Sequence, residues 1–182
     1  MAKRSLDPCR LDVAAFADAA GELTGHWPLA GLRRLADMEH HEALIATGQQ
    51  VDWAVRGERR VGKTGPVQTW LHLSTRAQLQ LVCQRCLQPV ATPLVAQRSF
   101  LFVQGEAAAE ELDAECEDDV LALSRELDVR ELVEDELLLS LPLVPKHEQC
   151  PEPLPGATTS GDAEQPHPFA ALAALKRGAK HG

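Results

Sequence analysis

Polar and apolar residues alternate over a long stretch in the middle of the chain. Every second position from Thr69 to Cys83 carries Thr, Leu, Ala or Cys, and the positions between are mostly polar, with Trp70 the main exception. Successive side chains of a strand point to opposite faces, so the alternation predicts one long strand with one apolar face. Residues 90–103 form a second strand-like run. We therefore predict a β-hairpin whose tip is the segment CQRCLQP.

The flanking segments predict further elements. Residues 9–47 look helical and loop-like, residues 51–55 alternate as a strand does, and residues 57–66 are turn-rich. Asp128 is a predicted helix N-cap, and the apolar stripe after it ends before Pro142. We expect the three consecutive acids of this helix to form a solvated face, and the segment LPLVPKHEQC to run extended back to the hairpin. The acids are Glu134, Asp135 and Glu136.

These elements predict an α+β fold: an antiparallel sheet with a long β-hairpin carrying CxxC at its tip, plus helices and a flexible C-terminal tail. We expect residues 1–150 to form a single domain. Residues 151–166 are rich in Pro, Gly, Ser and Thr, which predicts a flexible linker. Residues 167–182 predict a short helical tail, which is too short to be stable without a surface to dock on.

Composition narrows the class of protein. The chain has 182 residues, of which 45% are hydrophobic and 25% charged, so it can fold around a core. No run of apolar residues is long enough to span a membrane, and the N-terminus lacks the apolar region of a secretory signal. An odd number of cysteines, 5, does not suit a secreted disulfide framework. We therefore expect a cytoplasmic protein.

The negative charge is concentrated in one block. Residues 104–136 hold 14 acidic and 2 basic residues, whereas residues 1–103 hold 9 acidic and 12 basic ones. Such a block repels phosphate, so it is either a solvated surface or a docking surface for a basic protein. The candidate partner surface comprises Glu115, Glu117, Asp118 and Asp119.

Direct contact with RNA would instead use the net-positive part of the chain. The candidate residues on or near the predicted strands are Arg76, Arg85 and Arg98. Arg85 lies between two cysteines at the predicted hairpin tip, where its guanidinium could reach a phosphate. The alternative for each of the three is an ordinary solvated strand residue.

The segment from Gly57 to Thr64 fits the expression GxxxxGK[ST] of a nucleotide-binding P-loop. A true P-loop follows a buried strand and opens a helix. Here the preceding strand alternates, Gly65-Pro66 follows at once, and the next pattern is another strand. We therefore interpret the segment as a hairpin loop.

Cys83 and Cys86 form a CxxC pair, and His147 and Cys150 form a second pair of candidate ligands. Cys and His are the usual ligands of a structural Zn²⁺, so Zn²⁺ is the candidate cofactor. Two alternatives stay open: a reduced cysteine cluster that packs the hairpin tip, and a redox-active dithiol. A thioredoxin-like CxxC opens a helix after a parallel strand, which the predicted hairpin does not provide.

Three segments resemble one family of bacterial proteins. They are LVCQRCLQPV at 81–90, LVEDELLLSLPLVPKHEQC at 132–150 and PHPFAALAALKR at 166–177. In order and spacing they are similar to the YceD family, the large ribosomal RNA subunit accumulation proteins. The resemblance implies a ribosome biogenesis factor that supports synthesis, processing or stability of the large-subunit 23S ribosomal RNA. It brings no catalytic residues with it.

From the resemblance and the residues together we expect a protein that acts by binding and is not an enzyme. The expected partner is ribosomal precursor RNA or a basic ribosomal protein, with no membrane and no small-molecule substrate. The alternatives are a thiol redox protein that uses the CxxC pair, or a zinc-stabilised protein-interaction adaptor.

Overall fold

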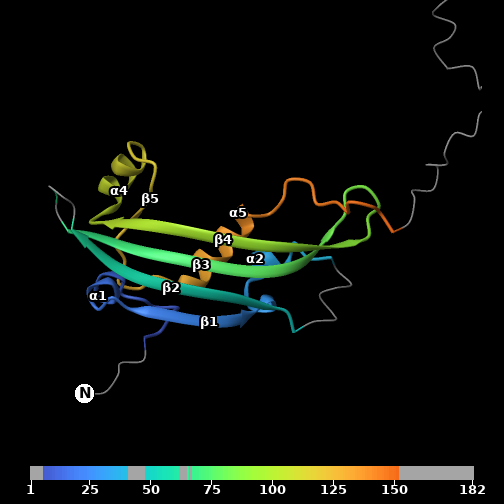
Figure 1. The fold of residues 1–182 in the computed structure, drawn as a ribbon. Coiled ribbons are helices and arrows are strands. Elements are labelled where there is room, and N and C mark those ends of the chain that lie inside the picture. Colours follow the sequence, from blue (N-terminus) through green and yellow to red (C-terminus); the bar gives the residue numbers. More distant parts are fainter. Residues whose placement is uncertain (1–5, 41–47, 62–64, 66, 152–182) are drawn as a thin grey trace, which may run out of the picture. The chain divides into compact units, whose positions relative to one another are not determined.

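The computed structural model describes residues 6–40, 48–61, 65 and 67–151. Met1–Glu148 forms one compact unit, which contains every helix and strand named here. In chain order these are α1 (Val13–Asp18), β1 (Glu22–Pro28), the 3-10 helix η1 (Leu29–Gly31), α2 (Arg33–Ala36), β2 (Gln50–Val61), β3 (Val67–Val82), β4 (Pro89–Val103), α4 (Glu106–Asp113), β5 (Asp119–Ala122) and α5 (Val129–Leu139) (Figure 1).

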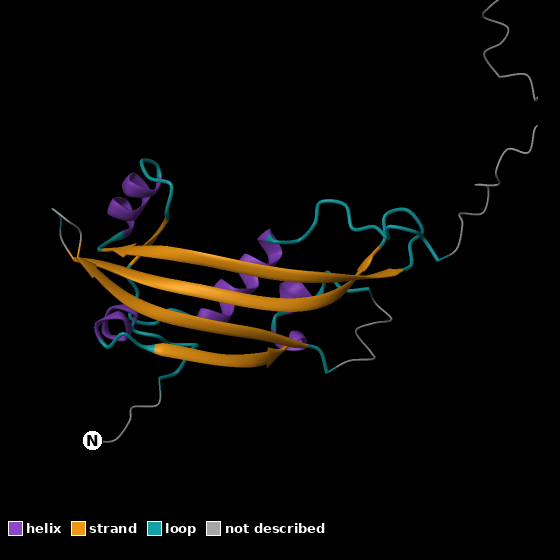
Figure 2. Cartoon of the chain, viewed as in Figure 1, coloured by secondary structure: helices purple, strands orange, loops and turns teal. Residues whose placement is uncertain are grey.

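The strands form a single sheet in the order β1-β2-β3-β4-β5 (Figure 2). Neighbouring strands are antiparallel except β4 and β5, which are parallel. The predicted hairpin is β3–β4, and its register runs without a bulge from Thr69↔Phe102 to Val82↔Pro89. The predicted α+β fold and the position of the CxxC pair at the hairpin tip are confirmed. The predicted tail, and the predicted linker beyond Pro151, lie outside the described residues.

The main core lies on one face of the sheet. The alternation in β3 buries Leu71, Leu73, Leu79 and Leu81 on this face. Helices α1, α2 and α5 supply the opposing side chains, such as Phe16, and complete one cluster. Burying a side chain of this size contributes roughly 1.5–3 kcal/mol, so this face carries most of the hydrophobic stabilisation.

The opposite face of the sheet is polar over most of its area. It presents His72, Ser74 and Arg76 from β3, with the aligned residues of β2 and β4 beside them. Among the described residues, α4 covers one end of this face, where Ala109 of α4 packs with Trp70, Leu101 and Val120 of the sheet in a second, smaller cluster. Trp70 departs from the polar pattern of its face because it belongs to this second cluster.

The P-loop-like segment joins two antiparallel strands. β2 and β3 pair up to Val61↔Val67, so no helix follows the segment. Gly57 lies within β2, where a Cβ would stand 2.8 Å from the Cα of Ala17 on α1. This glycine is needed for the close approach of α1 to the sheet, not for a phosphate. The hairpin interpretation is confirmed, although residues 57–61, expected to be loop, belong to the strand.

A further expectation about secondary structure was wrong. Residues 9–47 contain a strand, β1, whose inward positions carry Leu23, Gly25 and Trp27. The central inward position of β1 is Gly25, so the alternation of apolar and polar residues is not visible in the sequence. A Cβ at this position would lie 2.7 Å from the Trp53 ring. The acidic block, for which no strand was predicted, contains α4 and β5. β5 pairs only with the last residues of β4, so its four residues show no readable period.

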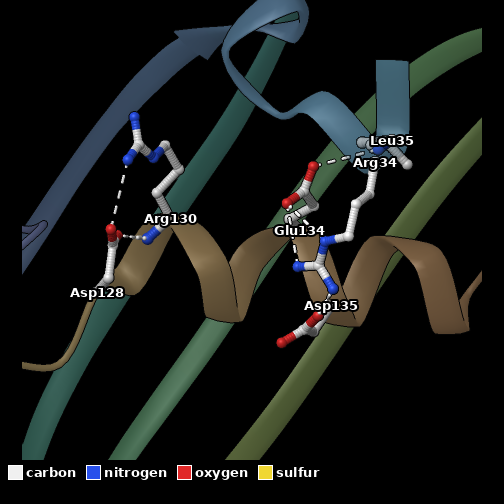
Figure 3. Close-up of polar contacts among 6 residues, drawn as sticks. All are labelled: Arg34, Leu35, Asp128, Arg130, Glu134 and Asp135. Carbon is white, nitrogen blue, oxygen red and sulfur yellow. Dashed lines mark hydrogen bonds and ion pairs between the residues drawn. The ribbon is translucent and has the colours of Figure 1, made fainter. Parts of the chain in front are cut away.

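The three consecutive acids of α5 do not form the solvated face that the sequence predicted. Glu134 and Glu136 are 8% and 7% exposed, and only Asp135 is open to solvent. Glu134 pairs with Arg34 of α2 (Figure 3). Glu136 pairs with Arg98 of β4. Burial is tolerated because each carboxylate keeps a charged hydrogen-bond partner. The predicted N-cap is confirmed, since Asp128 accepts a hydrogen bond from the N–H of Arg130 at 2.8 Å.

Among the described residues, no helix has both the length and the apolar composition needed to cross a bilayer.

Candidate metal centre at the hairpin tip

The β3–β4 hairpin closes in a tight turn that holds the CxxC pair. The N–H of Cys83 donates to the carbonyl of Gln88 at 3.0 Å, and the N–H of Leu87 donates to the carbonyl of Cys83 at 2.9 Å. Leu87 adopts a left-handed conformation, with φ 62°, which a non-glycine residue rarely does. The turn reverses the chain within a few residues, so Cys83 and Cys86 face the same side.

The segment of residues 142–148, which we call the strap, crosses to this turn. The N–H of Gln84 donates to the carbonyl of Pro145 at 2.9 Å. The Arg85 guanidinium donates to the carbonyl of His147 at 2.7 Å and to that of Glu148 at 3.2 Å. The residues between the two cysteines therefore hold the strap in place through its backbone.

His147 has the tautomer that a metal ligand requires. Its Nε2 lies 3.1 Å from the carbonyl oxygen of Pro89, which can only accept, so Nε2 carries the proton. In a neutral ring Nδ1 is then the unprotonated nitrogen, and it lies 3.4 Å from Sγ of Cys86. A hydrogen bond from the other ring nitrogen to a carbonyl is the usual support of a metal-bound imidazole.

Cys83 is fully buried. Burial of its thiol favours the neutral form, but hydrogen bonds from the backbone N–H groups of Cys86, His147 and Arg85 outweigh it and lower the pKa of Cys83 to about 5. A thiolate is the form of cysteine that binds metals. The turn thus prepares a ligand that needs no deprotonation at neutral pH.

The two predicted pairs meet at this point. Ligand atoms of Cys83, Cys86, His147 and Cys150 all lie within 4.8 Å of one another, so the cluster could hold a metal ion. Three of these residues belong to the compact unit that ends at Glu148, and Cys150 follows just after it. The cysteines at positions 9 and 116 are not part of this cluster.

The predicted RNA contacts do not form one surface. Arg76 lies on the polar face of the sheet, where it pairs with Asp52 at 2.9 Å. Arg98 reaches from β4 towards α5, where it pairs with Glu136 at 3.1 Å and lies 3.7 Å from Asp119. Arg85 holds the strap. Each of the three arginines already has a contact within the protein.

The predicted acidic surface is contiguous in the chain and open. Its four residues, Glu115, Glu117, Asp118 and Asp119, lie between the end of α4 and the start of β5, and all four are exposed. Helix α4 adds the exposed Glu106, Glu110, Glu111 and Asp113. α4 and β5 lie together at one end of β4 (Figure 1).

The sequence did not indicate the backbone groups that complete the centre. The carbonyls of Pro89 and Pro145 orient His147 and the strap. The prolines at 142 and 145 do indicate an extended segment, because proline disfavours a helix in the residue before it. The pairing of these carbonyls with His147 and with the N–H of Gln84 depends on the hairpin register. That register is a property of the folded sheet and cannot be read from the local sequence.

Comparison with known proteins identifies the family of this chain. Residues 71–176 match the family model described as "Large ribosomal RNA subunit accumulation protein YceD". The chain is 36% identical, over 176 residues, to the protein of that name from Haemophilus influenzae, covering 93% of this chain and 96% of that protein. No solved structure matches the chain. The resemblance seen in three segments of the sequence is thus confirmed, and the chain belongs to the YceD family of large ribosomal RNA subunit accumulation proteins.

Proposed function

We propose that this protein supports the accumulation of large-subunit ribosomal RNA in the cytoplasm, and that it does so by binding rather than by catalysis. Membership of the YceD family, over nearly the whole chain, is the observation that carries the proposal. The state of the buried acids supports a non-catalytic role. Glu134 and Glu136 are each paired with an arginine of the fold, which gives both a structural role, although burial raises the pKa of Glu136.

The metal that we propose for the hairpin tip is Zn²⁺, bound by Cys83, Cys86, His147 and Cys150. Three thiolates and one imidazole form a common tetrahedral set for structural zinc. Ideal Zn–S and Zn–N bonds separate neighbouring S and N ligands by roughly 3.6 Å. The 3.4 Å between Sγ of Cys86 and Nδ1 of His147 is close to that spacing. The ion would tie the strap to the hairpin tip and would take no part in chemistry.

The partner that we propose is a basic ribosomal protein, met by the acidic surface of α4 and the loop that precedes β5. Eight exposed acids between Glu106 and Asp119, with no Lys or Arg among residues 104–124, favour a cationic partner over the RNA backbone. Direct contact with precursor RNA is the competing outcome. The candidates for it, Arg76, Arg98 and Arg85, each already have a contact within the protein.

Deletion of the gene tests the proposed role. We expect less large-subunit than small-subunit ribosomal RNA in the deletion strain, with the ratio restored by the wild-type gene on a plasmid. Unchanged ratios in both slow and fast growth would contradict the proposal. Ribosomal precursors should also accumulate in sucrose gradients, since an assembly defect and a transcription defect differ in that respect.

A further inference from the structure

The outer edge of β4 is open for most of its length. β5 pairs with β4 only from Phe100 to Val103. Within the described part of the chain, the backbone of residues 94–99 makes no hydrogen bond on the side away from β3. In Figure 1, β5 stands beside only the C-terminal end of β4. An open strand edge is a template for a further strand.

The backbone groups that point outwards can be identified. The carbonyl of Val103 faces away from β3, because it accepts a hydrogen bond from the N–H of Leu123 at 2.7 Å. Backbone groups alternate in direction along a strand, and the β3–β4 register has no bulge. Ser99, Gln97 and Val95 therefore also direct both their N–H and their C=O outwards.

Pro93 agrees with this assignment. It has the same parity as Val95, so its nitrogen points away from β3 and its missing N–H costs no bond within the sheet. Proline inside a sheet is found on edge strands for this reason.

A small groove with a mostly polar lining runs along this edge on the side of α5. It has a volume of about 230 Å³ and is lined by β4 from Val95 to Arg98 and by Glu136, Leu139 and Ser140 of α5 and its C-terminus. Leu139 is 73% exposed and Val95 is 63% exposed, although both are large apolar residues. Val95 aligns with Arg76 and so points to the polar face, whereas Leu139 lies on the α5 side of the edge. A strand added here alternates its side chains between the two faces, so one set would meet Leu139 and the other Val95.

At one end of the open edge, acidic residues outnumber the neighbouring cation, Arg98, which lies 3.7 Å from Asp119. Asp119 lies beside Phe100 in the β4–β5 register, and Glu117 and Asp118 immediately precede it in the chain. A strand added along residues 95–99 would bring its end to these carboxylates. Opposite charges favour a segment that carries Lys or Arg at that end.

We propose that the β4 edge at Val95, Gln97 and Ser99 binds an extended segment of a basic partner protein as an additional strand. Apolar side chains of the segment would contact Leu139 and Val95, and its basic end would face the acidic surface. Backbone hydrogen bonds supply affinity in this mode, and side-chain pockets supply selectivity. The inference deepens the proposed function, on which it rests for the nature of the partner.

The test uses the full-length protein and two synthetic peptides, KRTVTVT and its acidic counterpart EETVTVT. We expect amide hydrogen exchange of Val95, Gln97 and Ser99 to be fast in the free protein, and that of Ala96 and Arg98 to be slow. The basic peptide should slow exchange at the first three by at least about tenfold. Equal exchange at odd and even positions, no effect of the basic peptide at millimolar concentration, or equal effects of both peptides would each overturn the proposal.

Two pairs of variants locate the contact. Gln97→Pro removes the outward N–H, as the native Pro93 does four residues earlier in the strand. Gln97→Ala keeps that N–H and is the matched control. Leu139→Lys places a cation in the groove, whereas Leu143→Lys changes a leucine that does not line it. We expect the first member of each pair to weaken binding of the basic peptide by about tenfold or more, and the second to leave it unchanged. Equal binding within both pairs would overturn the proposal.

A second copy of this chain is the competing occupant of the edge. If sedimentation shows a dimer that Gln97→Pro converts to a monomer, a second copy of this chain covers the edge and the proposal is wrong. The result of the peptide-binding test can be distinguished from the result of the gene-deletion test of the proposed function. Peptide binding can fail while gene deletion still lowers large-subunit RNA, and peptide binding can succeed while deletion leaves that RNA unchanged.

Discussion

The carboxylate of Glu134 on α5 accepts a hydrogen bond from the backbone N–H of Leu35 on α2, at 3.2 Å (Figure 3). Helix α2 has only four residues, so its N–H groups have few partners within the helix. The other oxygen of Glu134 binds the guanidinium of Arg34 at 3.0 Å. One buried side chain therefore fastens α2 to α5 over the core.

Replacing Glu134 by Ala should destabilise the protein by about 2 kcal/mol, because it removes a charged hydrogen bond from a buried N–H. The measurement is the free energy of unfolding in urea. Asp135→Ala is the matched control. Asp135 also pairs with Arg34, at 2.7 Å, but its side chain is 50% exposed, so its loss should cost less than about 1 kcal/mol. Similar costs for the two variants would contradict the role assigned to Glu134.

The case of Glu134 shows where the sequence stopped being informative. Val129, Val133 and Leu137 give the helix a readable apolar stripe. Glu134 and Glu136 flank that stripe, and their burial depends on arginines 100 and 38 residues away along the chain. Local periodicity identifies the helix but does not reveal partners that only the fold brings near.

By contrast, much of the β3–β4 hairpin and of the candidate metal centre at its tip could be predicted from the sequence. The alternation of β3 is long and nearly unbroken, so the strand, its apolar face and the position of the CxxC pair could be predicted. That His147 and Cys150 join the same cluster followed from residue type and from the extended segment before them. The tautomer of His147 and the support from the Pro89 carbonyl needed the hairpin register.

The loss of folding stability at acidic pH should depend on Glu58. A hydrogen bond from His72 Nε2, at 2.8 Å, lowers the pKa of the Glu58 carboxyl below its usual 4.5; burial opposes the shift, and Arg60 adds to it. A carboxyl with a lowered folded-state pKa stabilises the protein above its unfolded-state pKa, and the contribution is lost as pH falls through the folded value. Glu58→Gln should therefore be less stable than wild type at neutral pH and converge with it in acid.

Thermal unfolding midpoints measured from neutral to acidic pH check this prediction. His72→Asn removes the imidazole Nε2 donor and keeps the Glu58 carboxylate. It should also make the unfolding midpoint depend less on pH in the acidic range. A Glu58→Gln protein that lost stability in acid as steeply as wild type would show that the Glu58–His72 contact is not the cause.

The metal prediction concerns the ligand set. We expect protein purified without chelator to hold about one equivalent of zinc, and Cys83→Ser, Cys86→Ser and His147→Gln each to lower that content strongly. Cys116→Ser is the control and should retain zinc, because Cys116 lies in a different part of the fold. Elemental analysis with thiol titration measures both quantities. Less than about a tenth of an equivalent in wild type, with all thiols titratable, would favour the reduced cysteine cluster.

The last prediction separates a protein partner from RNA. Neutralising the acidic surface, with Gln at 115 and 117 and Asn at 118 and 119, should abolish co-sedimentation with large-subunit precursors if a basic protein is the partner. Loss of these charges removes both the attraction and the steering of a cationic surface. Arg76→Glu should leave co-sedimentation intact, since Arg76 is 75% exposed on the polar face and would matter only if that face met phosphate.

A matched control separates the position of the charges from their number. Four exposed acids elsewhere in the fold can be neutralised together; they are Glu22, Asp37, Glu131 and Glu148. This variant carries the same net charge as the first and should co-sediment as wild type does. Loss in the Arg76→Glu protein alone would assign the contact to RNA. Equal loss in both neutralised variants would mean that net charge, rather than the surface of α4 and β5, governs the association, and retention in every variant would remove both surfaces from the function.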